Sequence, residues 1–196
     1  MNISVRAKSS EPNRCPWVTQ DPLYIHYHDF EWGIPIFEDK KLFEMLILES
    51  FQAGLSWLTI LRKRGNFTQA FEDWNPERVA RFNSMDIKRL MSDAGIVRNI
   101  LKIKASVQNA NAFLSIQENF GSFSHYIWRF TGGKPVIQKP RPVSLATIPV
   151  RTEISDDMSR DLKQRGFTFV GTKICYAFMQ ACGLADDHVQ SCFRAQ

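Results

Sequence analysis

The sequence has no apolar run that approaches the roughly 20 residues a membrane-spanning helix needs. Its first residues, MNISVRAKSSEPNR, also lack the apolar stretch of a secretory signal peptide. We therefore expect a cytoplasmic protein with no membrane partner. Cysteine is scarce as well, with only four in the chain. In a protein that is not exported, these are expected to be free thiols or metal ligands rather than disulfides.

Alternation of apolar and polar residues, the pattern of half-buried β-strands, is absent too. Apolar residues instead recur every three or four positions, which predicts an all-α fold. Helix N-caps are expected at Asp21, Asn75, Ser84 and Ser155, two of them followed by a proline. Residues 131–150 hold the one long irregular stretch and are interpreted as a surface connector.

Acidic residues are in the minority, with 20 against 25 lysines and arginines, so the net charge is +5. This balance is compatible with a polyanionic partner but does not establish one. A chain of 196 residues is long enough for one domain or two closely packed lobes. Residues 1–13 are predicted to form a disordered arm and residues 14–196 a single folded domain, expected to be monomeric.

One carboxylate lies in the apolar run LILESFQAGLSW. On a helix starting near Asp39, Glu49 comes seven residues after Leu42 and within about 20° of it, so it points inward. Burying an unpaired carboxylate costs several kcal/mol. The residue is therefore either half of a buried ion pair or part of a ligand pocket. The turn after this helix ends in Ser56, which can cap a helix that begins with Trp57.

Aromatic residues are concentrated just upstream. Sixteen residues contain Trp17, Tyr24, Tyr27, Phe30 and Trp32. Aromatic rings beside one acid suit a flat, electron-poor or cationic ring. An aromatic-rich core is the other reading of the same composition.

Potential metal ligands occur near both ends of the chain. Cys15 and His28 are close to the N-terminus, and His188 and Cys192 are spaced so that a helix would turn both to one face. Two thiolates and two imidazoles suit a closed tetrahedral zinc site, which would be structural because no position is left for water. Chance placement of Cys and His near the ends would produce the same pattern.

A helix–turn–helix pattern in DIKRLMSDAGIVRNILKIKASVQNA resembles an element that holds a DNA backbone through the amides of its turn. Its predicted phosphate-contacting residues are Gly95, Ile96, Val97, Arg98 and Lys102. A second basic cluster, RDLKQRGFTFVGTK, is read as a solvated helix face. Any two-helix corner can give the first pattern.

Several motifs occur together in a fixed order: RCPWVTQDPLYIHYHDFEWG, QAGLSW, DAGIVR, KRGFTFVGT and CYAFMQACGLADDHV. With them the chain closely resembles the 3-methyladenine DNA glycosylase I family over residues 14 to 192. The resemblance implies an all-α helix-hairpin-helix glycosylase fold of two helical lobes. It also implies structural zinc on Cys15, His28, His188 and Cys192. The implied base-binding residues are Glu49, Tyr24, Tyr27, Trp32 and Trp57.

The resemblance further implies a monofunctional enzyme of base excision repair that hydrolyses the N-glycosidic bond of N3-methylated adenine. Its partner would be double-stranded DNA with alkylated bases, and it would release free 3-methyladenine. Glu49, ionised, is the expected catalytic and recognition residue. Where the family has a glycine after this acid, the chain has Ser50 and then Phe51. The alternatives are a non-enzymatic, zinc-stabilised module that binds damaged DNA, and a hydrolase of free nucleosides.

Overall fold

The structure is a computed structural model that describes residues 11–195. The predicted disordered arm thus falls mostly outside the described residues. Asn13, which was placed in it, belongs instead to the folded domain. Its side-chain Nδ2 donates a hydrogen bond of 2.6 Å to the carbonyl of Ser191, and its own carbonyl accepts one of 2.8 Å from the amide of Phe193.

Helices dominate the described residues, as the periodicity predicts. The α-helices are α1 (Pro22–Phe30), α2 (Asp39–Gln52), α3 (Trp57–Ala70), α4 (Pro76–Ala80), α5 (Ser84–Ser92), α6 (Ile100–Phe120), α7 (Phe123–Trp128), α8 (Glu153–Gln164) and α9 (Thr172–Ala181). Short 3-10 turns occupy Glu72–Trp74, Arg129–Thr131 and Leu145–Thr147. Two short strands, β1 (Val136–Ile137) and β2 (Ala185–Asp186), pair in parallel and were not predicted.

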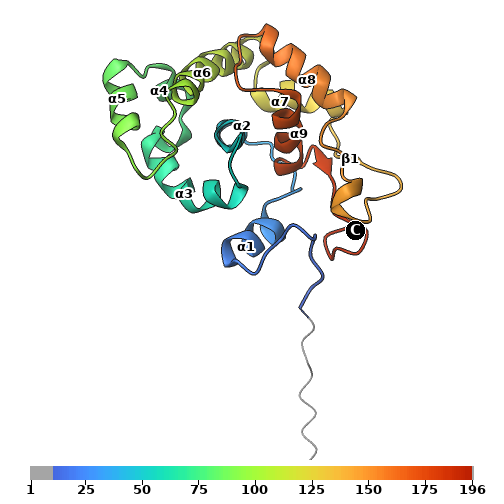
Figure 1. Cartoon of the computed structure of the whole chain (residues 1–196). Helices are drawn as coiled ribbons and strands as arrows, with labels where there is room; N and C mark the ends of the chain where they lie inside the picture. The colour runs from blue at the N-terminus through green and yellow to red at the C-terminus, as the bar shows by residue number, and fades with distance from the viewer. Residues whose placement is uncertain (1–10, 196) are drawn as a thin grey trace, which may run out of the picture.

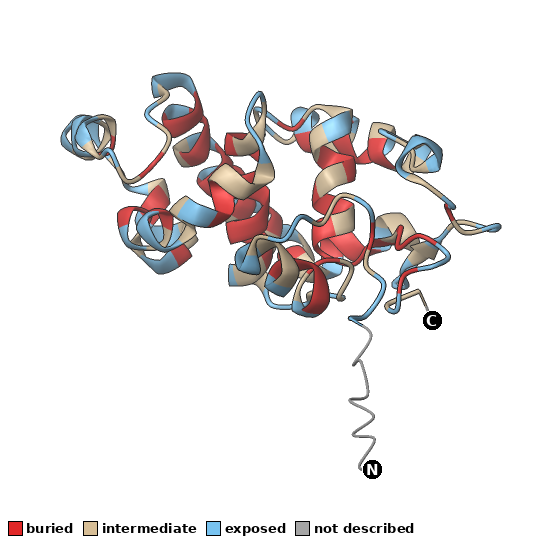
Figure 2. Ribbon diagram, turned by 60° about the horizontal axis from the view of Figure 1, so that its bottom comes forward, coloured by how far each residue is buried: buried red, intermediate tan, exposed pale blue. Residues whose placement is uncertain are grey.

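Helix α2 is the centre of the fold. Every residue from Leu42 to Phe51 is buried, so the helix is surrounded by other elements on all sides. In Figure 1, α3 to α6 lie on one side of it and α7 to α9 on the other, with α1 below. Figure 2 shows buried residues along the inward faces of these helices. Glu49 is therefore carried by the most enclosed element of the protein.

The helix starts follow from local sequence. Asp21, Ser56 and Asn75 cap α1, α3 and α4 through their side chains, as predicted. The predictions of Ser84 and Ser155 as caps are wrong, because better-placed residues precede them. Asn83 caps α5 in a capping box with Asp86. Thr152 caps α8, and Ser155 serves as the third residue of that box.

The end of α9 is packed closely against the segment that follows α1. Gly183 has φ of +71°, and a Cβ there would lie 2.4 Å from the carbonyl carbon of Ile34. Only glycine allows this approach. The amide of Gly33 donates to the carbonyl of Gln180 over 3.0 Å in the same region. None of the helices in the described part of the chain is long and apolar enough to cross a membrane.

Candidate functional site

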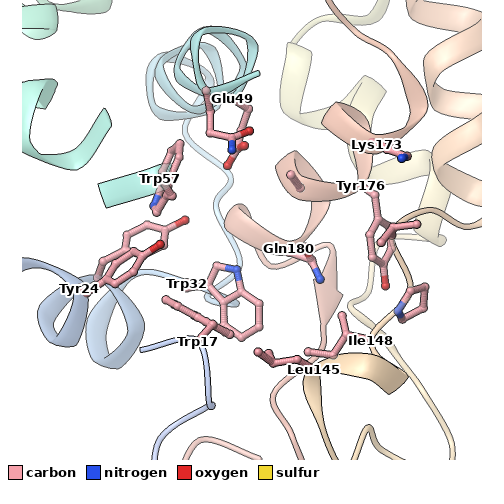
Figure 3. Close-up of a pocket in the computed structure, with 15 residues that line it drawn as sticks. Trp17, Tyr24, Trp32, Glu49, Trp57, Leu145, Ile148, Lys173, Tyr176 and Gln180 are labelled. Carbon is pink, nitrogen blue, oxygen red and sulfur yellow. The ribbon is translucent and has the colours of Figure 1, made fainter. Parts of the chain in front are cut away.

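A cavity of about 460 Å³ opens between α1, α2 and α9. Figure 3 shows its side chains converging from these elements and from the segment before α8. The volume lies in the range of small-ligand pockets. Its lining consists of Trp17, Tyr24, Tyr27, Trp32, Glu49, Gln52, Trp57, Leu145, Ile148, Pro149, Val150, Lys173, Tyr176, Ala177 and Gln180. Glu49 and the four predicted aromatic residues are all among these.

Glu49 points from α2 into this cavity (Figure 3). The residue is only 5% exposed, and burial alone raises the pKa of its carboxyl to about 8. The two other acids on its side of the fold pair with Arg64: Glu44 at 2.6 Å and Glu31 at 2.7 Å. Glu49 takes part in no ion pair among the described residues, so the pocket, and not a buried ion pair, is the setting of this carboxylate.

The residues after Glu49 point away from the cavity. Ser50 donates its hydroxyl to the carbonyl of Leu46 over 2.8 Å, within α2. Phe51 is fully buried and packs on Phe67, with ring centroids 4.8 Å apart. Neither side chain lines the pocket. The bulk beside Glu49 is therefore accommodated in the core.

The aromatic side chains form one continuous wall. The rings of Tyr27 and Trp57 have centroids 5.4 Å apart, and Trp17 packs edge-on against both Tyr24, at 5.3 Å, and Trp32, at 5.0 Å. The indole N–H of Trp57 is buried and has no acceptor among the described residues. A ligand in the cavity can thus stack on rings and accept a hydrogen bond from this indole.

Half of the pocket was missed by sequence reasoning. Residues 131–150 were interpreted as a surface connector, yet Leu145 to Val150 contribute to the wall. Helix α9 supplies Lys173, Tyr176, Ala177 and Gln180. These four recur at helical spacing on one face of α9, which is a signal that could have identified them.

The four predicted metal ligands come together beside the pocket. Cys15, His28, His188 and Cys192 are all buried, and their ligand atoms lie within 4.8 Å of one another. Sγ of Cys15 is 3.5 Å from Nδ1 of His188, and Sγ of Cys192 is 3.4 Å from Nε2 of His28. Ligand atoms on a tetrahedral zinc ion lie about 3.3–3.8 Å apart, given bond lengths of about 2.0–2.3 Å. The donor set and spacing fit such an ion.

The cluster has an outer layer of polar partners. Nδ1 of His28 lies 2.8 Å from Oδ1 of Asp29, which directs Nε2 toward the cysteines. Asp29 is held in turn by Arg14 through Nε at 2.9 Å and Nη2 at 2.8 Å. Burial lowers the pKa of His28, which favours the neutral imidazole that binds metals. A carboxylate behind a ligating histidine is typical of zinc sites.

The cluster of Cys15, His28, His188 and Cys192 also contacts the pocket wall. The ring of Trp32 lies 4.6 Å from that of His188, and the ring of Trp17 lies 5.3 Å from that of His28. Both tryptophans line the cavity. The termini are thus joined directly behind the aromatic wall.

The predicted phosphate-binding turn between α5 and α6 does not offer the expected amides. Gly95 N donates to Oδ1 of Asp93 at 2.7 Å, and Ile96 N donates to the Asp93 carbonyl at 3.4 Å. Ile96 is also buried. Of the turn residues, Arg98 is exposed and Val97 half-buried. The prediction that Gly95 and Ile96 donate to a phosphate is therefore wrong, because Asp93 already takes both protons.

Lys102 is the clearest correction. Its side chain is 6% exposed, and Nζ donates to the carbonyl oxygens of Phe51, at 2.8 Å, and Ala53, at 2.7 Å. Burial lowers its pKa. Lys102 closes the C-terminal end of α2 and does not face DNA.

The hairpin between α8 and α9 has the free amides that the other lacks. Gly171 precedes α9 and no side chain caps that helix. Among the described residues, the amides of Phe169 to Thr172 have no hydrogen-bond acceptor. Phe169 is exposed with φ of +54°. Lys173, exposed in the first turn of α9, also lines the pocket.

Comparison with known proteins decides the family. Residues 17–195 match the family model of methyladenine glycosylase. The chain belongs to the methyladenine glycosylase family. DNA-3-methyladenine glycosylase 1 of Escherichia coli K12 is 51% identical over 91% of this chain and 95% of its own length. DNA-3-methyladenine glycosylase of Haemophilus influenzae is 44% identical over 91% of this chain and 96% of its own.

Solved structures of family members share the fold. A crystal structure of 3-methyladenine DNA glycosylase I superposes with a TM-score of 0.91 at 49% identity, covering 94% of this chain and 100% of the other. The Staphylococcus aureus enzyme, solved to explain 3-methyladenine recognition, gives 0.89 at 40% identity, covering 94% and 97%. The predicted all-α glycosylase fold is thereby confirmed.

Proposed function

We propose that this member of the methyladenine glycosylase family excises N3-methylated adenine from alkylated double-stranded DNA. It hydrolyses the N-glycosidic bond and leaves free 3-methyladenine and an abasic site. The observation that carries the proposal is the placement of Glu49, a buried carboxylate without a protein counter-charge, in a pocket walled by aromatic rings. Family relatives that carry the name DNA-3-methyladenine glycosylase support the same reaction.

Methylation at N3 gives adenine a formal positive charge, so the base departs without being protonated. The enzyme therefore needs recognition more than strong acid catalysis. In the absence of a bound cation, burial raises the pKa of Glu49 to about 8, so the carboxyl is mostly protonated at neutral pH. This refines the expectation that Glu49 is ionised. The cationic base supplies the missing counter-charge, lowers that pKa and draws Glu49 into its ionised form.

Ionised Glu49 then accepts a hydrogen bond from the exocyclic amine of the flipped base. Neutral adenine brings no positive charge to offset the cost of burying the carboxylate, so it gains less binding free energy from Glu49. Stacking on Trp57 and the neighbouring rings stabilises the flipped base by about 1–3 kcal/mol, which offsets part of the free energy needed to remove it from the duplex. As the bond breaks, the sugar becomes oxocarbenium-like and water attacks it.

In this proposal the DNA backbone contacts the α8–α9 hairpin, beside the pocket. The uncapped N-terminus of α9 and the exposed ammonium of Lys173 both suit a phosphate. Arg98, exposed after the α5–α6 turn, is a further point contact. This assignment moves the predicted helix-hairpin-helix contact from the first hairpin to the second.

Zinc is the proposed metal of the Cys15, His28, His188 and Cys192 cluster. The chain fills all four positions, so the ion would be structural and would leave no site for a reacting water. Its chemistry would be cross-linking: it would join the segment before α1 to the segment after β2.

One experiment tests the activity. Purified protein is incubated with methylated duplex DNA, and the released bases are identified by chromatography. Release of 3-methyladenine from the wild type, with strongly reduced release by Glu49→Gln at unchanged fold and metal content, supports the proposal. Binding without release would favour the zinc-stabilised binding module, and release from free nucleosides alone would favour a nucleoside hydrolase.

A further inference from the structure

A second carboxylate is buried behind the pocket wall, on the α9 side. Asp187 follows β2 and is only 1% exposed. Oδ2 accepts hydrogen bonds from the hydroxyl of Tyr176 at 2.5 Å and from Nε2 of Gln180 at 2.8 Å. Nε2 of Gln138 approaches Oδ1 at 3.3 Å. Tyr176 and Gln180 line the cavity and Asp187 does not, so it reaches a ligand only through them.

These hydrogen bonds orient the hydroxyl proton of Tyr176 and the side-chain amide of Gln180, the two polar groups on the α9 side of the pocket that contact Asp187. A tyrosine hydroxyl has one proton, and that of Tyr176 goes to Asp187, which leaves its oxygen as an acceptor. Burial and this hydrogen bond raise the pKa of Tyr176, so it keeps that proton. The amide nitrogen of Gln180 faces the same carboxylate, which leaves Oε1 as its acceptor. The oxygens of Tyr176 and Gln180 are thus held as acceptors, because Asp187 takes the hydroxyl proton and one amide proton.

We infer that Asp187 is a specificity-determining positioning residue: it orients Tyr176 and Gln180 so that the oxygens of both side chains act as acceptors on the α9 wall, which favours a positively charged ligand. The inference deepens the proposed function and rests on it. Figure 3 shows Tyr176 and Gln180 on α9, across the cavity from Trp57 and Tyr24. A cationic base would therefore meet negative potential from this wall as well as from Glu49.

The neighbouring charges do not cancel this effect. Lys173 shares the α9 face, but it is exposed and one turn before Tyr176, where water screens it. Asp186, next to Asp187, pairs with Arg141 at 2.9 Å and does not line the cavity. Asp186 therefore offers a matched control: an adjacent carboxylate that contacts neither wall residue.

The test compares a cationic ligand with a neutral one of the same shape. In a duplex carrying 3-deaza-3-methyladenine, carbon replaces N3, so the base keeps its methyl group, has no charge and is not released. Its dissociation constant is measured by fluorescence anisotropy. The half-saturating protein concentration is measured for single-turnover release from methylated duplex. The selectivity ratio is the dissociation constant for the neutral analogue divided by the half-saturating concentration for the cationic substrate. This ratio reports charge selectivity, and a general loss of binding does not change it.

In Asp187→Asn, the new amide donates a hydrogen bond to one wall residue, whose own proton then points elsewhere. The ratio should therefore fall about five- to tenfold, in keeping with the loss of one ordinary hydrogen bond. Tyr176→Phe should lower it in the same direction by less, and Asp186→Asn should leave it unchanged. Metal content and circular dichroism are measured for each variant. A merely structural role would weaken both ligands equally, and an unchanged ratio would overturn the inference.

Two results separate this inference from the proposed function. If the wild type releases no base, the proposed function fails. If the wild type releases 3-methyladenine but Asp187→Asn keeps the wild-type ratio, only the role of Asp187 fails. Should Asp187→Asn not fold, Tyr176→Phe decides, because it removes one acceptor and leaves the Gln180 bond to Asp187 in place.

Discussion

Lys102 on α6 closes the C-terminal end of α2, where its Nζ donates a hydrogen bond of 2.8 Å to the carbonyl oxygen of Phe51. The last carbonyls of a helix have no partner within it, and a buried ammonium is a strong donor for them. Because Glu49 lies less than one turn before Phe51, this bond also fixes the part of α2 that enters the pocket.

Replacing Lys102 by methionine should therefore destabilise the fold. The variant keeps the apolar stem but leaves two buried carbonyls without a donor, so the free energy of unfolding should fall by about 2–4 kcal/mol. Urea unfolding measures this change. Lys104→Met, an exposed lysine on the same helix, should change it by no more than about 0.5 kcal/mol. Equal effects of the two substitutions would contradict the assignment.

Glu49 should make stability depend on pH. Its folded-state pKa of about 8 lies above the ordinary value of 4.5, so the folded protein binds this proton more tightly than the unfolded chain does. The resulting stabilisation is complete below the unfolded-state pKa and is lost as pH rises toward and through 8. Glu49→Gln lacks this titration. Its free energy of unfolding should rise relative to wild type by roughly 3–5 kcal/mol between pH 4 and pH 9.

Urea titrations of both proteins across this range test the idea, since all other groups cancel in the difference. Parallel stability curves for wild type and Glu49→Gln would show that Glu49 has an ordinary pKa in the folded protein. The pocket would then bind the cationic base without the change in ionisation proposed for it.

Removal of the metal should destabilise the packing of the N-terminal segment against the C-terminal segment. We expect about one zinc per chain by atomic emission, and Cys192→Ser should lose it and lower the free energy of unfolding by several kcal/mol. Cys175→Ser is the matched control, because Cys175 is equally buried but packs in α9 away from the cluster. It should cost stability and keep the metal. Metal retained by Cys192→Ser would argue against the four-ligand site.

Lys173 should contribute one phosphate contact. Lys173→Ala should weaken binding to a duplex with an abasic site for every sequence alike, and the slope of log affinity against log salt should decrease by about 0.9. Lys88→Ala, on α5 and outside the cavity lining, should leave the slope unchanged. Identical slopes for wild type and Lys173→Ala would place the DNA backbone elsewhere.

Helical periodicity was enough to place Glu49 inside the fold. Its position seven residues after Leu42 identifies the inward face whatever α2 packs against. Caps were predictable where a single Asx or Ser precedes a helix, as at Asp21 and Asn75. They were not where two polar residues compete, because the backbone geometry that favours Asn83 over Ser84 is not written in residue type.

The choice between the two hairpins shows what sequence could not supply. Both contain glycine and nearby lysines, but only the folded structure shows that Asp93 accepts hydrogen bonds from amides of the first turn, while the amides before α9 stay free. In the same way, the burial of Lys102 depends on α2, which lies about 50 positions earlier in the chain. Long-range packing, not local pattern, decides which lysine meets solvent.

The cluster of Cys15, His28, His188 and Cys192 has a consequence for the order in which the protein folds during synthesis. Cys15 and His188 are 173 positions apart, so nearly the entire domain must leave the ribosome before they can meet. Trp17 contacts the ring of His28 and Trp32 that of His188, so the packing of this wall is complete only then. A newly made chain thus acquires its recognition surface as one of the final steps of synthesis.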